Sequence, residues 1–439
     1  MGMSGTKQTA PLYRRLPHGP SGMAREEVER NQRSRLYGSM VEAVARNGYE
    51  RTTVAHVIAL AGVSRRAFYE LFDNKEECFL GTYDVMVAQA RRRLLQAWLS
   101  DHGWENRMHA SCQSLLGGLA RAPKGPRLVL VDSLGIGPRA RERMQLAGLV
   151  FERIVATAFS LAPEQVCFPQ LTSRVVVAGV RNIVFNRLLE RRHRELAELS
   201  DEVLDWIESY RMPQGMRLRT LTLARPAHLP PVPAAFLTRD DKRARVLGSV
   251  VHLTLDEGYA ALTDPQIAQF AGVSTEAFHR QFRNKEECFL TVLDEFVAET
   301  LECVRPAMDG ADSWAEAACL AMEAFVAHLV AHQALLRLAF IDLFEVGPAM
   351  IARMTSSVAA FTEMLTENAP APQRAPQIAQ EAVTGGVWGV ISTFVSNNRL
   401  SRLPSLVDHL AFTVLAPYVG ARPAVEALNA CRQRRGVAA

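Results

Sequence analysis

Residues 61–80 read AGVSRRAFYELFDNKEECFL, and residues 271–290 read AGVSTEAFHRQFRNKEECFL. Fourteen of the twenty positions are identical, and the two segments lie 210 residues apart. Five of the six differences fall at positions 65, 66, 69, 70 and 71, between one unchanged block and the next. One chain therefore carries the same unit twice, and most of the change is confined to a short part of that unit.

The repeat continues beyond these two segments. Trp104 pairs with Trp314 at the same offset, and RLVLVDSLGIGPRARERM from residue 127 pairs with RLAFIDLFEVGPAMIARM from residue 337. Further along, the offset becomes 207, so that Gly179 pairs with Gly386. A period of this length is too long for a solenoid repeat. The sequence therefore predicts a duplicated domain of about 200 residues.

Composition indicates an ordinary globular protein. The 439 residues are 48% hydrophobic and 22% charged, with a net charge of +4, which is compatible with binding to nucleic acid. The seven cysteines show no C-x-x-C spacing, so neither a disulfide framework nor a zinc site is expected. We find no apolar run of membrane-spanning length and no apolar leader segment, and we therefore expect a cytoplasmic protein that does not enter a membrane.

Helical periodicity runs through both copies. Apolar residues recur three and four positions apart, as at Val297, Leu301 and Val304, which predicts an all-α protein. Prolines between the copies predict a semi-rigid linker. The predicted units are a mobile arm (1–24), a first helix-turn-helix head (25–78), a first helical body (79–222), the linker (223–238), a second head (239–288), a second body (289–425) and a tail (426–439).

Each copy contains the pattern of a helix-turn-helix motif. In the first copy, Thr53 is placed to cap a short helix, Gly62 can adopt the positive φ that ends it, and Ser64 can cap a second short helix. A long amphipathic helix over 25–47 precedes this pair. In the second copy, Pro265 falls at the first position of the equivalent helix. Two short helices joined by a tight turn with glycine form the helix-turn-helix signature.

The stretch TTVAHVIALAGVSRRAFYELFDNKEECF, residues 52–79, resembles the DNA-binding domain of the TetR/AcrR family of bacterial transcriptional regulators. The resemblance rests on Gly-Tyr before the threonine cap, A-G-V-S, Phe-Tyr, and phenylalanine followed by Asn-Lys-Glu. It covers the head of each copy, and the rest matches only in helical pattern and length. It implies a three-helix head on a helical regulatory body, usually in a homodimer. Here two protomers look fused into an intrachain pseudo-dimer. Assembly of several chains into a higher homo-oligomer is left as an alternative.

The resemblance also gives candidate DNA contacts. An arginine in the first turn of the second motif helix can make a bidentate contact with guanine in the major groove, although a solvated arginine pair is the alternative. Glutamate at the same place in the second copy can accept from cytosine but repels phosphate. The candidate contacts are Thr53, Ser64, Arg65, Arg66, Tyr69 and Lys75 in the first head, and Thr263, Ser274, Thr275, Glu276, His279 and Lys285 in the second.

A ligand cavity inside each body is the next expectation from the resemblance. Candidate lining residues are Met108, Cys112, Leu116 and Phe151 in the first copy, and Met322, Phe325 and Phe361 in the second. Helix periodicity alone selects them, so ordinary core packing is the alternative. Because duplication frees one body from needing a pocket, we expect the two cavities to differ. The last two helices of each body, 172–191 with 198–219 and 375–397 with 404–419, are expected to form the four-helix contact between the copies.

No motif for catalysis is present. His328 and His332 lie four residues apart but lack the glutamate of a zinc-protease motif, so we interpret them as ordinary helix histidines and expect no metal. Glycines 135 and 137 precede a proline and predict a helix break, not a phosphate loop. We expect no enzyme activity and no cofactor.

The sequence thus favours a repressor that reads an imperfect palindrome in double-stranded DNA and is released by a small apolar effector. The alternative is a protein-interaction or corepressor module in which the second head no longer binds DNA.

Overall fold

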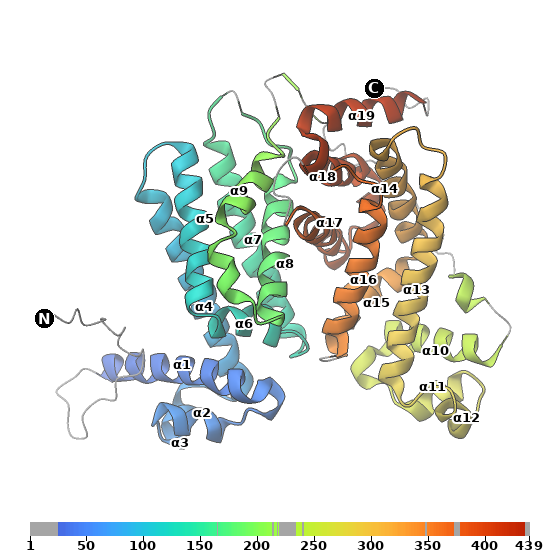
Figure 1. The fold of residues 1–439 in the computed structure, drawn as a ribbon. Helices are drawn as coiled ribbons and strands as arrows, with labels where there is room; N and C mark the ends of the chain where they lie inside the picture. The colour runs from blue at the N-terminus through green and yellow to red at the C-terminus, as the bar shows by residue number, and fades with distance from the viewer. Residues whose placement is uncertain are drawn as a thin grey trace, which may run out of the picture.

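The computed structural model describes residues 25–164, 166–212, 215–216, 218, 234–238, 241–346, 349–372 and 378–434. The predicted arm, most of the predicted linker and the end of the predicted tail lie outside these residues. Over the described residues the chain is helical and forms no strand, apart from one isolated bridge between Cys167 and Met212. The predicted all-α class is confirmed (Figure 1).

The first half begins with a three-helix head and continues into a body of long helices. The head helices are α1 (Arg25–Arg51), α2 (Val54–Ala61) and α3 (Arg65–Leu71). The body contains α4 (Lys75–Leu99), α5 (Trp104–Arg121), α6 (Lys124–Arg127), the π-helix η1 (Leu128–Asp132), α7 (Pro138–Ser160), α8 (Thr172–Leu189), η2 (His193–Ala197) and α9 (Ser200–Glu208). The predicted break before Pro138 is confirmed, with positive φ at Gly135 and Gly137.

The second half follows the same plan. Its head contains η3 (Ala235–Leu237), α10 (Lys242–Glu257), η4 (Tyr259–Ala261), α11 (Asp264–Phe270) and α12 (Thr275–His279). Its body contains α13 (Lys285–Met308), α14 (Trp314–Ala331), α15 (Gln333–Phe340), η5 (Asp342–Glu345), α16 (Ala349–Thr366), α17 (Ala379–Ser396), η6 (Leu400–Leu406), α18 (Val407–Val419) and α19 (Ala421–Arg434). Residues 426–434, placed in the predicted tail, are therefore helical. They pack because Leu428 and Cys431 are buried in contact with the body core.

The duplication is visible in the positions of the helices. Helix α13 begins 210 residues after α4, and α17 begins 207 residues after α8, as the sequence offsets require. The paired tryptophans also make equivalent contacts. The indole Nε1 of Trp104 donates to the Ala158 carbonyl at 2.7 Å, and that of Trp314 donates to the Leu365 carbonyl at 3.0 Å. Both indoles thus tie the start of one body helix to the end of another.

The two halves meet along α8 and α17, which cross at the centre of the molecule (Figure 1). Glycines allow the two helices to approach closely. A Cβ atom on Gly389 would lie 2.2 Å from the Ala178 Cβ, and one on Gly385 would lie 2.4 Å from the Asn182 Cβ. Interiors are close-packed, so this contact has no room for added atoms. The structure is therefore an intrachain pseudo-dimer built on one tight helix pair.

Polar contacts surround this helix pair. The Asn182 amide donates to the Glu381 carbonyl at 2.9 Å, and the Arg187 guanidinium donates to the Glu381 carboxylate at 3.0 Å. Desolvation raises the pKa of Glu381, while Arg187 opposes that shift. The Tyr210 hydroxyl donates to the Thr413 carbonyl at 3.1 Å. Removing one partner of a buried ion pair leaves an uncompensated charge, so Arg187 and Glu381 help to specify how the halves dock.

The helix that follows α8 is shorter than predicted. Instead of running over 198–219, α9 ends at Glu208. Pro213 follows a few residues later, and the residue before a proline avoids the helical region. Met212 accordingly leaves the helix and donates its N–H to the Cys167 carbonyl at 2.9 Å.

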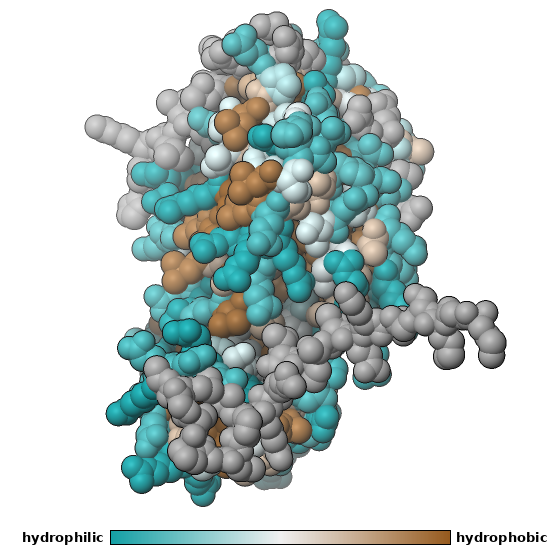
Figure 2. Space-filling model, turned by 90° about the vertical axis from the view of Figure 1, so that its left-hand side faces the viewer, coloured by the Kyte–Doolittle hydropathy of each residue, from teal (hydrophilic) through white to brown (hydrophobic). Residues whose placement is uncertain are grey.

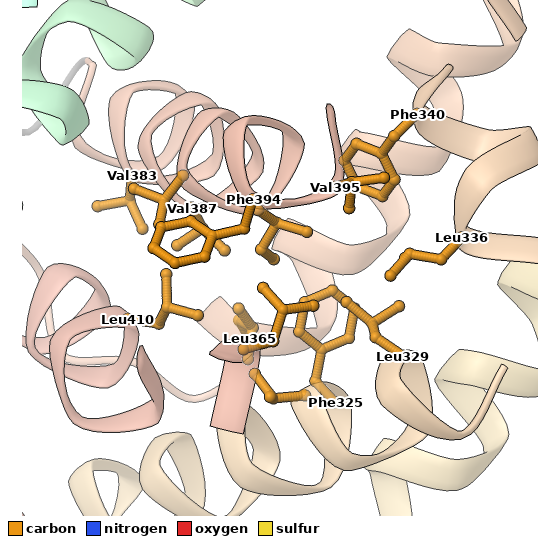
Figure 3. Close-up of a cluster of buried hydrophobic side chains, with 14 of the residues drawn as sticks. Phe325, Leu329, Leu336, Phe340, Leu365, Val383, Val387, Phe394, Val395 and Leu410 are labelled. Atoms are coloured by element: carbon orange, nitrogen blue, oxygen red, sulfur yellow. The ribbon is translucent and has the colours of Figure 1, made fainter. Parts of the chain in front are cut away.

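Buried side chains are distributed unequally between the halves. The core of head 1 forms a cluster separate from the main one and includes Leu128 and Ala140 of body 1, whereas that of head 2 is continuous with the core of body 2. Figure 3 shows part of the body 2 core, where Phe325 and Leu329 lie beside Leu365 and aliphatic side chains of α17 face the same interior. Helix α14 is long and apolar enough to cross a membrane by length and composition alone. It contributes ten buried residues to the body, which accounts for its apolarity.

Candidate DNA-binding surfaces and ligand cavity

Head 1 has the local geometry that the sequence predicts. The Thr53 hydroxyl accepts from the His56 N–H at 3.3 Å and caps α2, and the Ser64 hydroxyl accepts from the Ala67 N–H at 3.1 Å and caps α3. Gly62 adopts φ 59°, the left-handed conformation that ends α2. The buried Arg35 guanidinium donates to the carbonyls of Ala61 and Gly62, which fixes the turn between the motif helices.

The side chains predicted to read DNA lie on the outer face of this head. Arg65 and Arg66 are exposed at the start of α3, and Tyr69 is 49% exposed one turn later. The Arg66 Nε donates to the Glu70 carboxylate at 2.9 Å, so this arginine is paired in the free protein. The pair is on the surface and can be exchanged for a DNA partner at small cost, because exposed ion pairs contribute little. These residues stay predicted contacts.

Head 2 keeps the same framework. Thr263 caps α11, Ser274 caps α12, and Gly272 has φ 65° in the turn between them. The Phe278 ring is fully buried, as is the ring of its counterpart Phe68. The sequence differences between the heads therefore leave the motif intact and change its surface.

That surface carries different charges in head 2. Glu276 is exposed in the first turn of α12 and accepts from the Arg280 guanidinium at 3.3 Å. The His279 Nε2 lies 3.8 Å from the Asp264 carboxylate, and Thr275 is exposed without a charge. Arg280 thus lies in an exposed pair with Glu276, which occupies the position of Arg66, and the two charges cancel. Head 2 offers less positive charge to a phosphate backbone than head 1.

The two lysines predicted to contact phosphate also hold their heads together. The Lys75 ammonium donates to the Tyr49 carbonyl at 3.0 Å and lies 4.0 Å from the centre of the Tyr49 ring. The Lys285 ammonium donates to the carbonyls of Tyr259 and Leu262 at 3.1 and 2.7 Å, and desolvation lowers the pKa of Lys285. Because an ammonium has three donors, Lys75 keeps more capacity for a phosphate than Lys285 does.

A large cavity lies inside body 1. Its volume is about 1480 Å³, and α4, α5, α7 and α8 surround it. All four lining residues predicted for the first copy, Met108, Cys112, Leu116 and Phe151, border it. Burial raises the pKa of the Cys112 thiol to about 12, so this cysteine is an unreactive apolar side chain. The cavity exceeds the usual range for drug-sized ligands and is large enough for an extended molecule.

The cavity reaches the surface and the contact between the halves. Leu95 of α4 and Leu146, Leu149 and Leu161 in and after α7 border it and are each at least 40% exposed. Figure 2 shows apolar side chains gathered on this face, above head 1. Side chains of α17, including Trp388, also border the cavity. Sequence reasoning missed this contribution, because no local pattern tells which helix of the second copy faces the first body.

Several arginines border the cavity, and Arg181 combines desolvation with the lack of an acidic partner in the described residues. Arg181 of α8 borders the cavity and is exposed, yet nearby protein atoms desolvate its guanidinium and lower its pKa. Its side chain forms no ion pair with any acid in the described residues. By contrast, Arg174 at the cavity wall binds the Glu152 carboxylate at 2.6 Å. A desolvated cation in an apolar space favours a bound anion. No sequence pattern pointed to Arg181, since its proposed role depends on the cavity beside it.

The lining residues predicted for the second copy have a different environment. Met322 and Phe325 are buried, and the Phe325 and Phe361 rings lie 4.2 Å apart. None of the three borders the cavity of body 1, and all of them pack in or against the core of body 2. In this structure they pack as core side chains, and their role in ligand binding stays a prediction. The two bodies therefore differ in packing.

Both heads lie at one end of the molecule, each on its own helical body, with the bodies joined through α8 and α17 (Figure 1). This arrangement defines a two-headed helix-turn-helix protein. Residues 41–82 and 251–292 both match the family described as "Bacterial regulatory proteins, tetR family". The family model thus matches one region in each half of the chain, and the predicted tandem arrangement is confirmed.

Similarity to individual proteins extends over part of the chain. The HTH-type transcriptional activator FasR of Mycolicibacterium smegmatis is 28% identical over 127 residues, which are 29% of this chain and 58% of FasR. This chain thus spans just over half the length of that relative. The fatty acid degradation regulator FadR of Bacillus halodurans matches with 18% identity over 40% of this chain and 96% of its own, at a TM-score of 0.35. FadR of Bacillus subtilis, solved with stearoyl-CoA, matches with 16% identity over 42% of this chain and 98% of its own, at a TM-score of 0.36.

Proposed function

We propose that the protein is a cytoplasmic, ligand-responsive transcriptional repressor whose two unlike heads read an imperfect palindrome in double-stranded DNA. One observation carries this proposal above the others. The long helix α4 begins at Lys75 within head 1 and continues past Tyr83 to Trp98 along the cavity wall. A molecule bound in body 1 therefore contacts the same rigid element that supports a DNA-binding head.

We propose that the effector is an extended apolar molecule that carries one acidic group. The apolar walls of the cavity favour a hydrocarbon portion, since burying apolar surface stabilises a complex by about 25 cal/mol per Å². Arg181 would bind the acidic group and gain the partner that it otherwise lacks. This modifies the expectation of a purely apolar ligand.

Release from DNA would follow from a change in the relation between the heads. The core of head 1, with Leu128 and Ala140 of body 1, is separate from the main core, whereas the core of head 2 merges with that of body 2. A ligand that moves α4 would shift head 1 while head 2 stays fixed. Two heads read half-sites about one helical turn apart only when their spacing fits, so such a shift couples the cavity to DNA binding.

The test has two stages. Binding sites are first selected from random duplex DNA with the intact protein, and affinity is then measured by fluorescence anisotropy with and without a long-chain carboxylic acid. We expect the acid to release DNA from the wild-type protein and to act at least tenfold less potently on Arg181→Met. The matched alcohol, which lacks the charge, is expected to act weakly on both. In vitro transcription from the selected site then distinguishes repression from activation, the activity named for FasR.

The corepressor alternative also has support in head 2. The Glu276–Arg280 pair and the occupied Lys285 ammonium reduce the charge available for DNA in that head. If head 2 does not bind DNA, selection will return single half-sites, and Arg65→Ala in head 1 will abolish all binding. An asymmetric pair of half-sites would instead favour the two-headed reader.

A further inference from the structure

Body 2 contains a cluster of three potential metal ligands. Glu299 of α13, His328 of α14 and His332 at the end of α14 each place one ligand atom within 4.8 Å of the other two. The His332 Nε2 lies 3.8 Å from the Glu299 carboxylate. Both histidines are buried and Glu299 is half-buried. Residues four apart lie on one face of a helix, which brings the two imidazoles together.

A second observation comes from His328 itself. Its side chain is 7% exposed, and its Nε2 atom has no hydrogen-bond partner in the described residues. The Phe296 ring stacks on the imidazole with the ring centres 5.6 Å apart and holds its orientation. Buried polar atoms in native proteins almost always have a partner, so an orphaned imidazole nitrogen on a member of this cluster points to a ligand position.

We propose that Glu299, His328 and His332 bind one divalent transition-metal ion of the zinc class. Two imidazole nitrogens and one carboxylate oxygen form a donor set that suits zinc, with a fourth position for water. Metal–ligand distances of about 2.0–2.2 Å place the ligand atoms closer together than in the metal-free arrangement, so small side-chain rotations close the site.

The surroundings of Glu299 fit this role. Both of its carboxylate oxygens accept from the Ala235 N–H at 3.0 Å. Such outer contacts orient metal ligands and are a regular part of metal sites. Ala235 begins η3, which packs on α10 of head 2. A bound ion would therefore lock α13, α14 and the entry to head 2 into one unit.

This site is independent of the proposed effector cavity, which lies in the other body. The sequence alone led us to interpret His328 and His332 as ordinary helix histidines, and the proposed site replaces that interpretation. The spacing of the two histidines supplies only two ligands, and the third, Glu299, lies on the preceding helix α13. Only the folded arrangement of α13 against α14 shows it.

The test uses full-length protein stripped of metal with a chelator that is then removed. Zinc is titrated in competition with a chromogenic chelator, and bound zinc is counted by elemental analysis. We expect one ion per chain. His332→Ala and Glu299→Gln are expected to lower the affinity at least tenfold, and the second change preserves side-chain shape and an oxygen acceptor for Ala235. The matched control is His409→Gln, since His409 is equally buried, with an unpartnered Nδ1 atom, but belongs to no such cluster in the described residues.

Cobalt(II) in place of zinc reports the ligand type. Visible ligand-field bands without a thiolate charge-transfer band are expected for the wild type and for His409→Gln, and they should be lost in Glu299→Gln. Circular dichroism shows whether each variant is folded. If His332→Ala does not fold, Glu299→Gln alone tests the site. A thiolate band, unchanged affinity in both site variants, or no stoichiometric zinc in the wild type would overturn the proposal.

Discussion

At the scale of single residues, the two heads differ mainly in where their charges are engaged. Arg66 is paired with Glu70 on the surface of α3, while Glu276 occupies the same position in α12 and pairs with Arg280. Sequence alone predicted the caps at Thr53 and Ser64, because N-cap chemistry is local. It did not predict these surface pairings, which depend on side-chain direction.

Arg66→Ala should weaken DNA binding by about 1–3 kcal/mol and relax base preference in one half-site, because a bidentate guanine contact is lost there. The measurement is site selection followed by anisotropy at fixed salt. Lys75→Ala is the comparison. It should weaken binding to all sequences and flatten the salt dependence, as loss of a phosphate contact does. Equal relaxation of both half-sites by Arg66→Ala would contradict the assignment.

Buried His409 should make the protein sensitive to acid. Desolvation lowers its pKa to about 4 in the folded state, against 6.5 for an unperturbed histidine. The unfolded state therefore binds more protons between pH 6.5 and 4, and the free energy of unfolding falls as the pH falls through that window. His409→Gln should reduce that slope by up to about 1.4 kcal/mol per pH unit. Urea unfolding at several pH values measures it, and an unchanged slope would show that His409 does not titrate as a buried group.

At the scale of elements, the crossing of α8 and α17 determines how the halves join. The sequence and the family resemblance located both helices to within a few residues of their observed ends. The length of α9 was overestimated, since apolar periodicity continues past Glu208 while the chain turns before Pro213. The close approach at Gly389 could not be read from sequence, because a glycine in a helix has several possible reasons.

Gly389→Ala should destabilise the protein by about 1–3 kcal/mol or more, because the new methyl group would lie 2.2 Å from the Ala178 Cβ. Gly148→Ala is the matched control. Gly148 is also in a helix, with nothing within 4 Å of an added Cβ, so alanine there should be neutral or mildly stabilising. Urea denaturation of both variants gives the comparison. Equal stabilities would mean that α8 and α17 do not pack as closely as described.

At the scale of the whole molecule, duplication has left two unequal bodies. Body 1 encloses the cavity of about 1480 Å³, and its wall includes α17 of the other copy. In body 2, Met322 and Phe325 are buried against core neighbours. The duplication and the two heads follow from the repeat in the sequence. The sequence does not show which body encloses the cavity, because helix periodicity selects core residues and lining residues alike.

Filling the cavity should separate ligand response from DNA binding. Cys112→Phe adds volume at the cavity wall, so it should reduce effector binding at least tenfold. DNA affinity should stay within about twofold, since Cys112 lies on α5 of the body and not on a head helix. Ala321→Phe is the contrasting variant. Ala321 is fully buried in body 2, and overpacking there should destabilise the fold by about 1–3 kcal/mol. A normal effector response in folded Cys112→Phe would place the effector elsewhere.

We propose that one chain supplies both heads for one DNA site. Sedimentation of the protein with its selected duplex measures the number of chains in the complex, and footprinting shows how many half-sites they protect. We expect a complex of one 48.6 kDa chain with one duplex, in which the two heads protect two unequal half-sites about one helical turn apart. Two chains on a perfect palindrome, with one head of each protecting DNA, would contradict it.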